Sequence, residues 1–314
     1  MRLAGARALV TGGGGFLGRA VLEQLQEAGA KVVAPGRAEY DLLRETDVAR
    51  LFAEHRPEVV FHLAADVGGI GYNLANPGRT LYNNVTMTAL VMEQARRAGV
   101  EKFVGAGSVC AYPEHAAVPF REDELWDGYP EPSNGPYGLA KRMMLVQGQA
   151  YRAQYGFNAI YLLIMNLYGP GDHFEPDRSH VIAALIRRML EAHEAGAPEL
   201  VVWGDGEATR EFLYVDDAAR GLLRAAERYD GAAPVNLGAG FEISIRDLAT
   251  LLAELTGYRG RLVFDASRPS GQRRRSADVT RARQEFGFAA RVSLREGLTR
   301  TIAWYRAQRA GTAR

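Results

Sequence analysis

A glycine-rich loop close to the N-terminus constrains the fold of this chain more than any other feature. It follows a strand-like segment, residues 8–11, and precedes a segment in which Leu17, Val21 and Leu25 recur at helical spacing. Glycines in such a loop let the backbone turn tightly and let the helix pack closely on the strand. The loop consists of Thr11, Gly12, Gly13, Gly14, Gly15, Phe16, Leu17 and Gly18.

This loop contains two overlapping dinucleotide-binding patterns. Gly13, Gly15 and Gly18 match G-x-G-x-x-G, and Gly12, Gly15 and Gly18 match G-x-x-G-x-x-G. The N-terminus of the following helix offers unpaired N–H groups and a partial positive charge to a pyrophosphate. A nucleoside-triphosphate loop is excluded, because Arg19-Ala20 stands where Lys-Ser/Thr is required.

Short β-branched runs alternate with amphipathic segments along the first half of the chain. Strands are predicted at residues 8–11, 31–34, 59–63, 103–106 and 158–164, and a helix at residues 83–97. This order predicts an α/β protein, a Rossmann-type doubly wound parallel sheet with a smaller, discontinuous C-terminal α/β substrate domain. We expect residues 1–169 and 211–239 to form the cofactor domain, and residues 170–210 and 240–314 the substrate domain.

The residues after the second strand indicate the choice of cofactor. An acidic residue there would bind the ribose 2′-hydroxyl of NAD, whereas this chain has Arg37. A guanidinium suits a 2′-phosphate, so the sequence favours NADP(H). Alternatively, Arg37 is an ordinary surface arginine and Glu39 or Asp41 binds the ribose.

Three further residues form a catalytic pattern. Ser108 follows the fourth strand, and Tyr137 and Lys141 lie 29 and 33 residues later. The i, i+4 spacing places Tyr137 and Lys141 on one helix face, where the ammonium is expected to lower the phenol pKa. Ser108 would hydrogen-bond a substrate oxygen while Tyr137 exchanges its proton. Lys141 is one of only three lysines among 38 basic residues, and arginine would not replace it in proton sharing.

Composition excludes several classes of protein. A net charge of +1 argues against nucleic acid or an anionic membrane as partner. The single cysteine, Cys110, forms no intrachain disulfide, and without a Cys cluster or H-E-x-x-H we expect no metal site. Residues 1–7 lack the apolar core of a signal peptide, and the longest apolar run is too short to span a bilayer. We therefore expect a cytoplasmic protein.

The chain resembles the extended short-chain dehydrogenase/reductase superfamily in its glycine loop and in Ser108, Tyr137 and Lys141. Within it, the chain is similar to the GDP-L-fucose synthase family, the GDP-4-keto-6-deoxy-D-mannose 3,5-epimerase-4-reductases. The segments that carry the likeness include residues 64–70, 107–113, 166–170, 179–182, 201–204, 210–213 and 263–267.

The resemblance implies an NADPH-dependent enzyme that epimerises GDP-4-keto-6-deoxy-D-mannose at C3 and C5 and reduces C4. It implies that Cys110 and His180 move the epimerisation protons. Strand alternation would place Ser108 and Cys110 on one face. A bland alternative for Cys110 is a small buried hydrophobe. The cofactor is expected to contact the glycine loop, Arg37, Leu63, Ala64, Ala65, Ala106, Gly107, Ser108, Val109, Tyr137, Lys141, Ile164, Met165, Asn166, Leu167 and His180.

The resemblance also implies substrate contacts and a homodimer. Arg188 and Arg210 would bind the diphosphate of a GDP-sugar and Trp203 would offer a packing surface, the alternatives being surface charge and core packing. Ser270 stands where the family usually has a substrate-binding Asp. The run Arg273-Arg274-Arg275 after it either attracts phosphate or is solvated. The expected dimer forms through helices that contain residues 83–97 and 137–155.

Four rival functions are weighed at this point. The departure at Ser270 allows a reductase or epimerase of another GDP-4-keto-6-deoxy sugar. An NAD-dependent UDP-sugar 4-epimerase is disfavoured by Arg37 and Cys110. A non-catalytic NADP-binding regulator is disfavoured because the five chemical residues are all present. A sugar-nucleotide dehydratase is disfavoured because Val109-Cys110 replaces the Asp-Glu pair of those enzymes.

Overall fold

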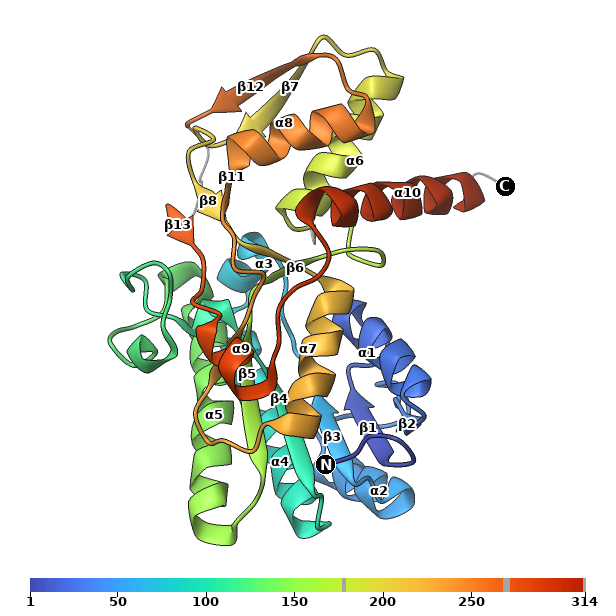
Figure 1. The fold of residues 1–314 in the computed structure, drawn as a ribbon, viewed down its shortest axis with the longest axis vertical. Coiled ribbons are helices and arrows are strands. Elements are labelled where there is room, and N and C mark those ends of the chain that lie inside the picture. The colour runs from blue at the N-terminus through green and yellow to red at the C-terminus, as the bar shows by residue number, and fades with distance from the viewer. Residues whose placement is uncertain (177–178, 268–271, 313–314) are drawn as a thin grey trace.

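A parallel six-stranded sheet forms the centre of the larger part of the molecule. The computed structural model describes residues 1–176, 179–267 and 272–312. The sheet order is β10-β5-β4-β3-β1-β2, and each neighbouring pair of strands is parallel. The predicted Rossmann-type doubly wound sheet is therefore confirmed (Figure 1). Its strands are β1 (Arg7–Thr11), β2 (Lys31–Val33), β3 (Val59–His62), β4 (Lys102–Ser108), β5 (Ala159–Ile164) and β10 (Val235–Leu237).

Helices cover both faces of this sheet, as parallel strands require. On one face α1 (Phe16–Glu27) packs against α7 (Val215–Arg228). On the other face α4 (Pro77–Arg97) packs against α5 (Gly135–Tyr155) and α2 (Glu45–His55). The central strands are consequently buried along nearly their whole length.

The structure moves two of the predicted boundaries by more than one residue. The helix predicted at residues 83–97 begins at Pro77, because proline suits the first turn of a helix. The strand predicted at residues 103–106 extends to Ser108, which places the predicted catalytic serine at the strand's carboxyl end.

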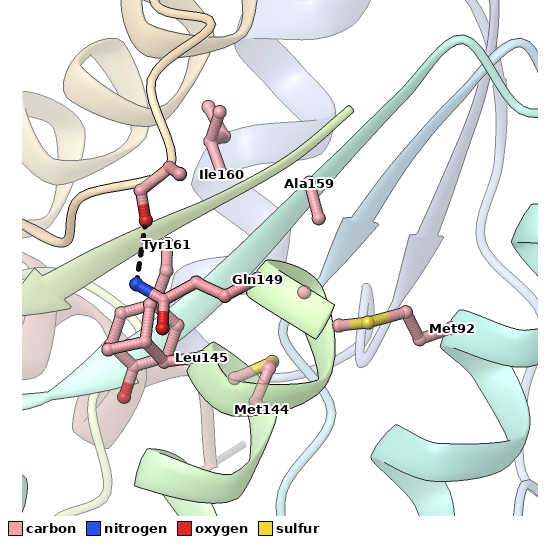
Figure 2. A pocket seen from close by; sticks show the side chains of 9 residues that line it. Met92, Met144, Leu145, Gln149, Ala159, Ile160 and Tyr161 are labelled. Atoms are coloured by element: carbon pink, nitrogen blue, oxygen red, sulfur yellow. Dashed lines mark hydrogen bonds between the residues drawn. The ribbon is translucent and has the colours of Figure 1, made fainter. Parts of the chain in front are cut away.

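Close packing fixes α5 against the sheet. Gly148 faces Ala159 of β5, and a Cβ at position 148 would lie 3.1 Å from the Ala159 Cβ. Figure 2 shows the small cavity that remains here, with Met92 and Met144 filling its sides and Gln149 donating to the Ala232 carbonyl at 3.1 Å. The cavity holds about 10 Å³, roughly the space of one water, so α5 has little freedom to shift.

The remaining elements build a second hydrophobic cluster above the sheet's carboxyl edge. β7 pairs with β12 in parallel, and β8 lies between β11 and β13. Apolar residues of α6, α8, β7 and α10 form the cluster. The elements are β6 (Asn166–Tyr168), α6 (Val181–Glu194), β7 (Glu199–Trp203), β8 (Thr209–Arg210), β9 (Phe212–Tyr214), β11 (Ile243–Ser244), α8 (Ile245–Thr256), β12 (Arg261–Asp265), β13 (Arg274–Arg275) and α10 (Leu294–Thr312).

The chain passes several times between this second cluster and the first hydrophobic cluster, which surrounds the large sheet. The chain leaves the large sheet along β6 and comes back towards it along β9, and these two strands pair in parallel. Near the C-terminus, α9 (Thr280–Phe286) packs on α7 and β10, and its Ala282 and Phe286 belong to the first cluster. The division at residues 169, 210 and 239 stays a prediction. The short elements α3 (Ile70–Ala75), η1 (Val109–Ala111), η2 (Glu122–Glu124) and η3 (Pro132–Asn134) lie in the connections of the first half.

No helix among residues 1–176, 179–267 and 272–312 combines the length and the apolar character needed to cross a bilayer.

Candidate active site

The predicted cofactor and catalytic residues gather at one edge of the large sheet. The glycine loop follows β1, Leu63–Ala65 follow β3, Ser108 ends β4, and Ile164 ends β5 beside it in register. Met165 continues from β5 and donates its N–H to Leu237 at the end of β10 (3.1 Å). Carboxyl ends of parallel strands form the usual ligand crevice of doubly wound sheets.

The glycine loop is shaped for close contact on its inner side and open on its outer side. Gly12 has φ +74°, and a Cβ there would lie 2.8 Å from the Ala64 nitrogen. At Gly18 a Cβ would lie 2.2 Å from the Gly12 oxygen, so helix α1 packs directly on the turn. At Gly14 it would meet nothing within 4 Å. Gly15 caps α1 without a side-chain bond, which leaves the first-turn N–H groups free of a side-chain acceptor. The residues present therefore fit a bound pyrophosphate.

A buried histidine that the sequence did not single out supports this loop. His62 lies fully buried at the end of β3, with Nδ1 2.8 Å from Thr11 Oγ1 and Nε2 3.2 Å from Thr88 Oγ1. Burial, with the nearby Lys141 charge, lowers the pKa of His62 to about 3. The ring is therefore neutral at physiological pH and acts as a fixed spacer between α4 and Thr11.

The structure brings Ser108, Tyr137 and Lys141 together. The Ser108 side chain lies close enough to the Tyr137 hydroxyl to favour its ionised form, although burial outweighs this effect on the Tyr137 pKa. The Lys141 ammonium donates to the Ala106 carbonyl at 2.8 Å and lies 5.7 Å from the centre of the Tyr137 ring. Pro136 occupies the first turn of α5, and Asn134 is the N-cap residue but makes no side-chain cap bond.

One electrostatic prediction is wrong in direction. The sequence predicts that Lys141 lowers the pKa of Tyr137, whereas burial, together with the charge of a Cys110 thiolate, raises it. Burial also lowers the pKa of Lys141 to about 8. Desolvation outweighs the attraction between the two groups, because both side chains are buried and the ammonium is held by Ala106. The phenol therefore keeps its proton at neutral pH, as a proton donor must.

The structure also corrects the argument that placed Cys110 on the face of Ser108. The strand ends at Ser108, and Val109–Ala111 form a 3₁₀ turn instead of continuing β4. The turn begins there because the Ser108 Oγ accepts the Cys110 N–H at 3.2 Å. The thiol is half-buried and receives the Arg275 Nη1 at 3.8 Å. A Cβ at Gly138 of α5 would lie 2.3 Å from the Cys110 carbonyl oxygen, so this turn sits directly on α5.

His180 comes from a different part of the chain. It is the N-cap residue of α6, and its side chain is exposed to solvent. Desolvation by the protein atoms around the ring, together with the charge of His173, lowers the pKa of His180. No hydrogen bond joins His180 to Cys110 in the part of the chain that the structure describes, and their pairing stays a prediction.

The predicted ribose-binding residues lie in the turn after β2. Arg37 is exposed and makes no hydrogen bond or ion pair with any described residue. Asp41 is engaged in its own turn, since its Oδ1 accepts the Leu43 N–H at 3.2 Å, and Glu39 is exposed. The geometry favours Arg37 over Asp41 as the group available to a ligand.

The predicted substrate residues lie on α6, β7 and β8. Arg188 donates to the Val201 carbonyl at 2.6 Å. Trp203 is 59% exposed, so core packing is wrong for this side chain. Arg210 is half-buried, and burial with the nearby Arg275 charge lowers its pKa to about 10. Ser270 lies outside the described residues.

The pattern of the NAD dependent epimerase/dehydratase family matches residues 8–238, which include the sheet, the glycine loop and the Ser-Tyr-Lys group. The chain belongs to this family. Over 303 residues it is 42% identical to the probable GDP-L-fucose synthase 1 of Oryza sativa subsp. japonica, covering 96% of this chain and 92% of the relative.

Solved structures of the same architecture include two sugar-nucleotide enzymes. A GDP-6-OMe-4-keto-L-xylo-heptose reductase from C. jejuni superposes with a TM-score of 0.91 at 27% identity, covering 98% of this chain and 99% of that one. A GDP-L-fucose synthetase from Naegleria fowleri bound to NADP superposes with a TM-score of 0.87 at 28% identity, covering 98% and 96%. The epimerase/dehydratase fold therefore extends beyond residue 238 to nearly the whole chain.

Burial of Lys141 predicts a pH-dependent stability. Between the folded pKa of about 8 and the unfolded value of about 10.4, the unfolded chain holds a proton that the folded chain has released. The contribution of Lys141 to the free energy of unfolding therefore rises with pH in this window. Relative to it, Lys141→Met should be most favourable near pH 7, and that advantage should shrink by about 2 kcal/mol towards pH 10.

Urea denaturation of both proteins at the two pH values measures this difference. The control is Lys31→Met, which removes an exposed lysine and should leave no such trend. A difference between Lys141→Met and the unmodified protein that does not change with pH would contradict the assignment.

Proposed function

We propose that this enzyme converts GDP-4-keto-6-deoxy-D-mannose to GDP-L-fucose with NADPH, by epimerisation at C3 and C5 and reduction at C4. The observation that carries the proposal is the buried pair Tyr137 and Lys141 beside Ser108, with Cys110 in the adjoining turn. The 42% identity to a probable GDP-L-fucose synthase over 96% of the chain supports the substrate class.

The cofactor would lie along the carboxyl edge of the sheet. The N-terminus of α1 and the open side of Gly14 would receive its pyrophosphate, and Arg37 its 2′-phosphate. The NADP-bound Naegleria fowleri relative supports this choice of cofactor. The walls of the site would come from Leu63–Ala65, Ala106–Val109, Ile164–Leu167 and His180.

Reduction would use the residues at the end of β4 and on α5. NADPH supplies the hydride to C4 when it is bound. Tyr137 donates its proton to the C4 oxygen, and its raised pKa keeps that proton available. Ser108 hydrogen-bonds the same oxygen, and Lys141 holds the nicotinamide ribose and balances the charge that Tyr137 acquires.

Epimerisation would use the two groups whose ordinary pKa values lie nearest neutrality. The C4 ketone acidifies the hydrogens on C3 and C5, and Cys110 and His180 remove and return these protons. Arg188 and Arg210 would bind the diphosphate, and the exposed Trp203 ring would pack on the substrate.

A second candidate is a related reaction on another GDP-4-keto sugar. The sequence feature that favours it is Ser270, which stands where the resemblance to the fucose synthases leads us to expect an Asp. The heptose reductase relative has the same fold with a different sugar.

Deuterium labelling tests the proposed reaction directly. The protein is incubated with NADPH and GDP-4-keto-6-deoxy-D-mannose in D₂O, NADPH absorbance is followed, and the product is analysed by NMR. We expect NADPH consumption with deuterium at both C3 and C5. Cys110→Ser should slow the exchange at least about 100-fold while reducing a pre-epimerised substrate within a few-fold of the normal rate.

Reduction without label would remove the epimerase half of the proposal. Equal loss of exchange and reduction in Cys110→Ser would contradict the role given to the thiol. Turnover of another GDP-4-keto sugar in preference to this one would favour the second candidate.

Arg37 is expected to set the cofactor preference. Arg37→Ala should weaken NADPH binding by about 10- to 100-fold, because a charge-assisted contact to the 2′-phosphate is lost. NADH binding should stay unchanged, as measured by fluorescence titration of both cofactors. The control is Glu39→Gln, and loss of NADH binding in this variant would point instead to the acidic alternative.

We also propose that the protein is a cytoplasmic homodimer that pairs through α4 and α5. These two helices lie side by side and expose apolar side chains: Leu81, Tyr82, Met143, Val146 and Tyr155. Light scattering should give about twice the 34.4 kDa mass of one chain, and Val146→Asp should shift it towards the monomer. Ala117→Asp adds the same charge on an exposed loop and should change nothing; a monomeric unmodified protein contradicts the proposal.

A further inference from the structure

An arginine far from Cys110 in the sequence touches its sulfur. Arg275 of β13 lies 165 residues beyond Cys110, and its Nη1 donates to Cys110 Sγ at 3.8 Å. The other two residues of this basic run differ. Arg274 forms an ion pair with Glu242 at 2.7 Å, and Arg273 is exposed. Of these three arginines, only Arg275 is seen to contact the turn Val109–Ala111, which carries Cys110.

A neutral side chain fixes the orientation of the Arg275 guanidinium. Its Nε and Nη2 donate to the same oxygen, Oε1 of Gln272, at 3.0 and 2.7 Å. Gln272 in turn donates from Nε2 to the Glu114 carbonyl at 2.9 Å. Since Glu114 lies just beyond the turn of Cys110, Gln272 ties the guanidinium to the same piece of backbone that carries the thiol.

The charge of Arg275 is therefore not cancelled by a carboxylate. Within the described residues, no Asp or Glu lies within ion-pair distance of Arg275, and the acceptor of two of its N–H groups is an amide. Among the described residues, Arg275 from β13 contacts the thiol and Tyr137 from α5 lies close enough to feel its charge. Arg210 lies close enough to feel the Arg275 charge, which adds positive potential.

We propose that Arg275 is a positioning residue that holds Cys110 as a thiolate for epimerisation, and that Gln272 fixes the orientation of the Arg275 guanidinium. The proposal deepens the function given above and rests on it for the identity of the substrate. A guanidinium in contact with sulfur favours the thiolate over the thiol, and the thiolate is the form able to accept a proton.

The proton-transfer step balances without any further reactant. The Cys110 thiolate takes a proton from the carbon beside the C4 ketone: the C–H bond breaks, an S–H bond forms, and the electron pair passes into an enolate. The negative charge thereby moves from sulfur to the C4 oxygen, next to Tyr137 and Ser108. A proton returned to the opposite face of the carbon, for which His180 is the proposed donor, gives the epimer.

Alkylation of the thiol tests the proposal on the full-length protein. Because Cys110 is the only cysteine, the rate of iodoacetamide labelling against pH reports this thiol alone. In Arg275→Gln the midpoint of that curve should rise by about one pH unit, so that labelling near pH 7 slows about tenfold. Arg275→Lys should restore most of the rate, and Arg273→Gln, with the same loss of charge, should match the unmodified protein.

A second variant and a second readout guard against a purely structural effect. Gln272→Ala keeps both the Arg275 guanidinium and the Cys110 thiol. It should raise the midpoint of the labelling curve by less than Arg275→Gln does. In D₂O, the optimum pH for exchange should rise with the labelling midpoint in Arg275→Gln. An unchanged labelling midpoint in both Arg275→Gln and Gln272→Ala overturns the proposal. Absence of exchange in the unmodified protein overturns the proposed function instead, whatever the labelling curves show.

Discussion

The arrangement of the whole site depends on one buried carboxylate, Glu211, which is completely removed from solvent between β8 and β9. Its Oε1 accepts the N–H groups of Ala239 and Gly240 at 2.6 and 2.9 Å, and its Oε2 accepts Ser276 Oγ and the Ala277 N–H at 3.1 and 2.8 Å. Burial raises the pKa of Glu211, and these four donors oppose that rise. A buried acceptor satisfied on all sides fixes every segment that it touches, since losing it would leave the donors unpaired.

The segments that Glu211 joins carry the chemistry of the substrate side. Arg210 precedes it in the chain, and Arg275 lies one residue before Ser276. The backbone carbonyl of Glu211 accepts a hydrogen bond from Asn166 Nδ2 at 2.9 Å, and Asn166 lies in the segment after β5. The Glu211 side chain thus helps to fix the positions of β8 and β13 relative to the carboxyl edge of the sheet. Two positively charged arginines are held near each other there, an arrangement suited to an anionic ligand.

Features that depend on local sequence were predictable, and features that depend on distant contacts were not. The glycine loop, the β-α alternation and the i, i+4 pair Tyr137–Lys141 can be recognised from residue spacing alone, and the structure contains each of them. The pKa direction of Tyr137 was missed because burial depends on the assembled fold. The Arg275–Cys110 contact joins residues far apart in the chain, and the run of three arginines gave no sign of which one turns inward. His62 carried no signal beyond its place at a strand end.

The contact between Gly138 and the Cys110 carbonyl links two reactions that are chemically independent. The residue before Gly138 is the proton donor proposed for reduction, and the carbonyl belongs to the residue proposed to start epimerisation. Because this contact is tight, a shift of α5 towards the turn would press on the backbone that carries the thiol. The residues proposed for the two activities therefore meet at one tight backbone contact, and exchanging either side chain alone leaves that contact in place.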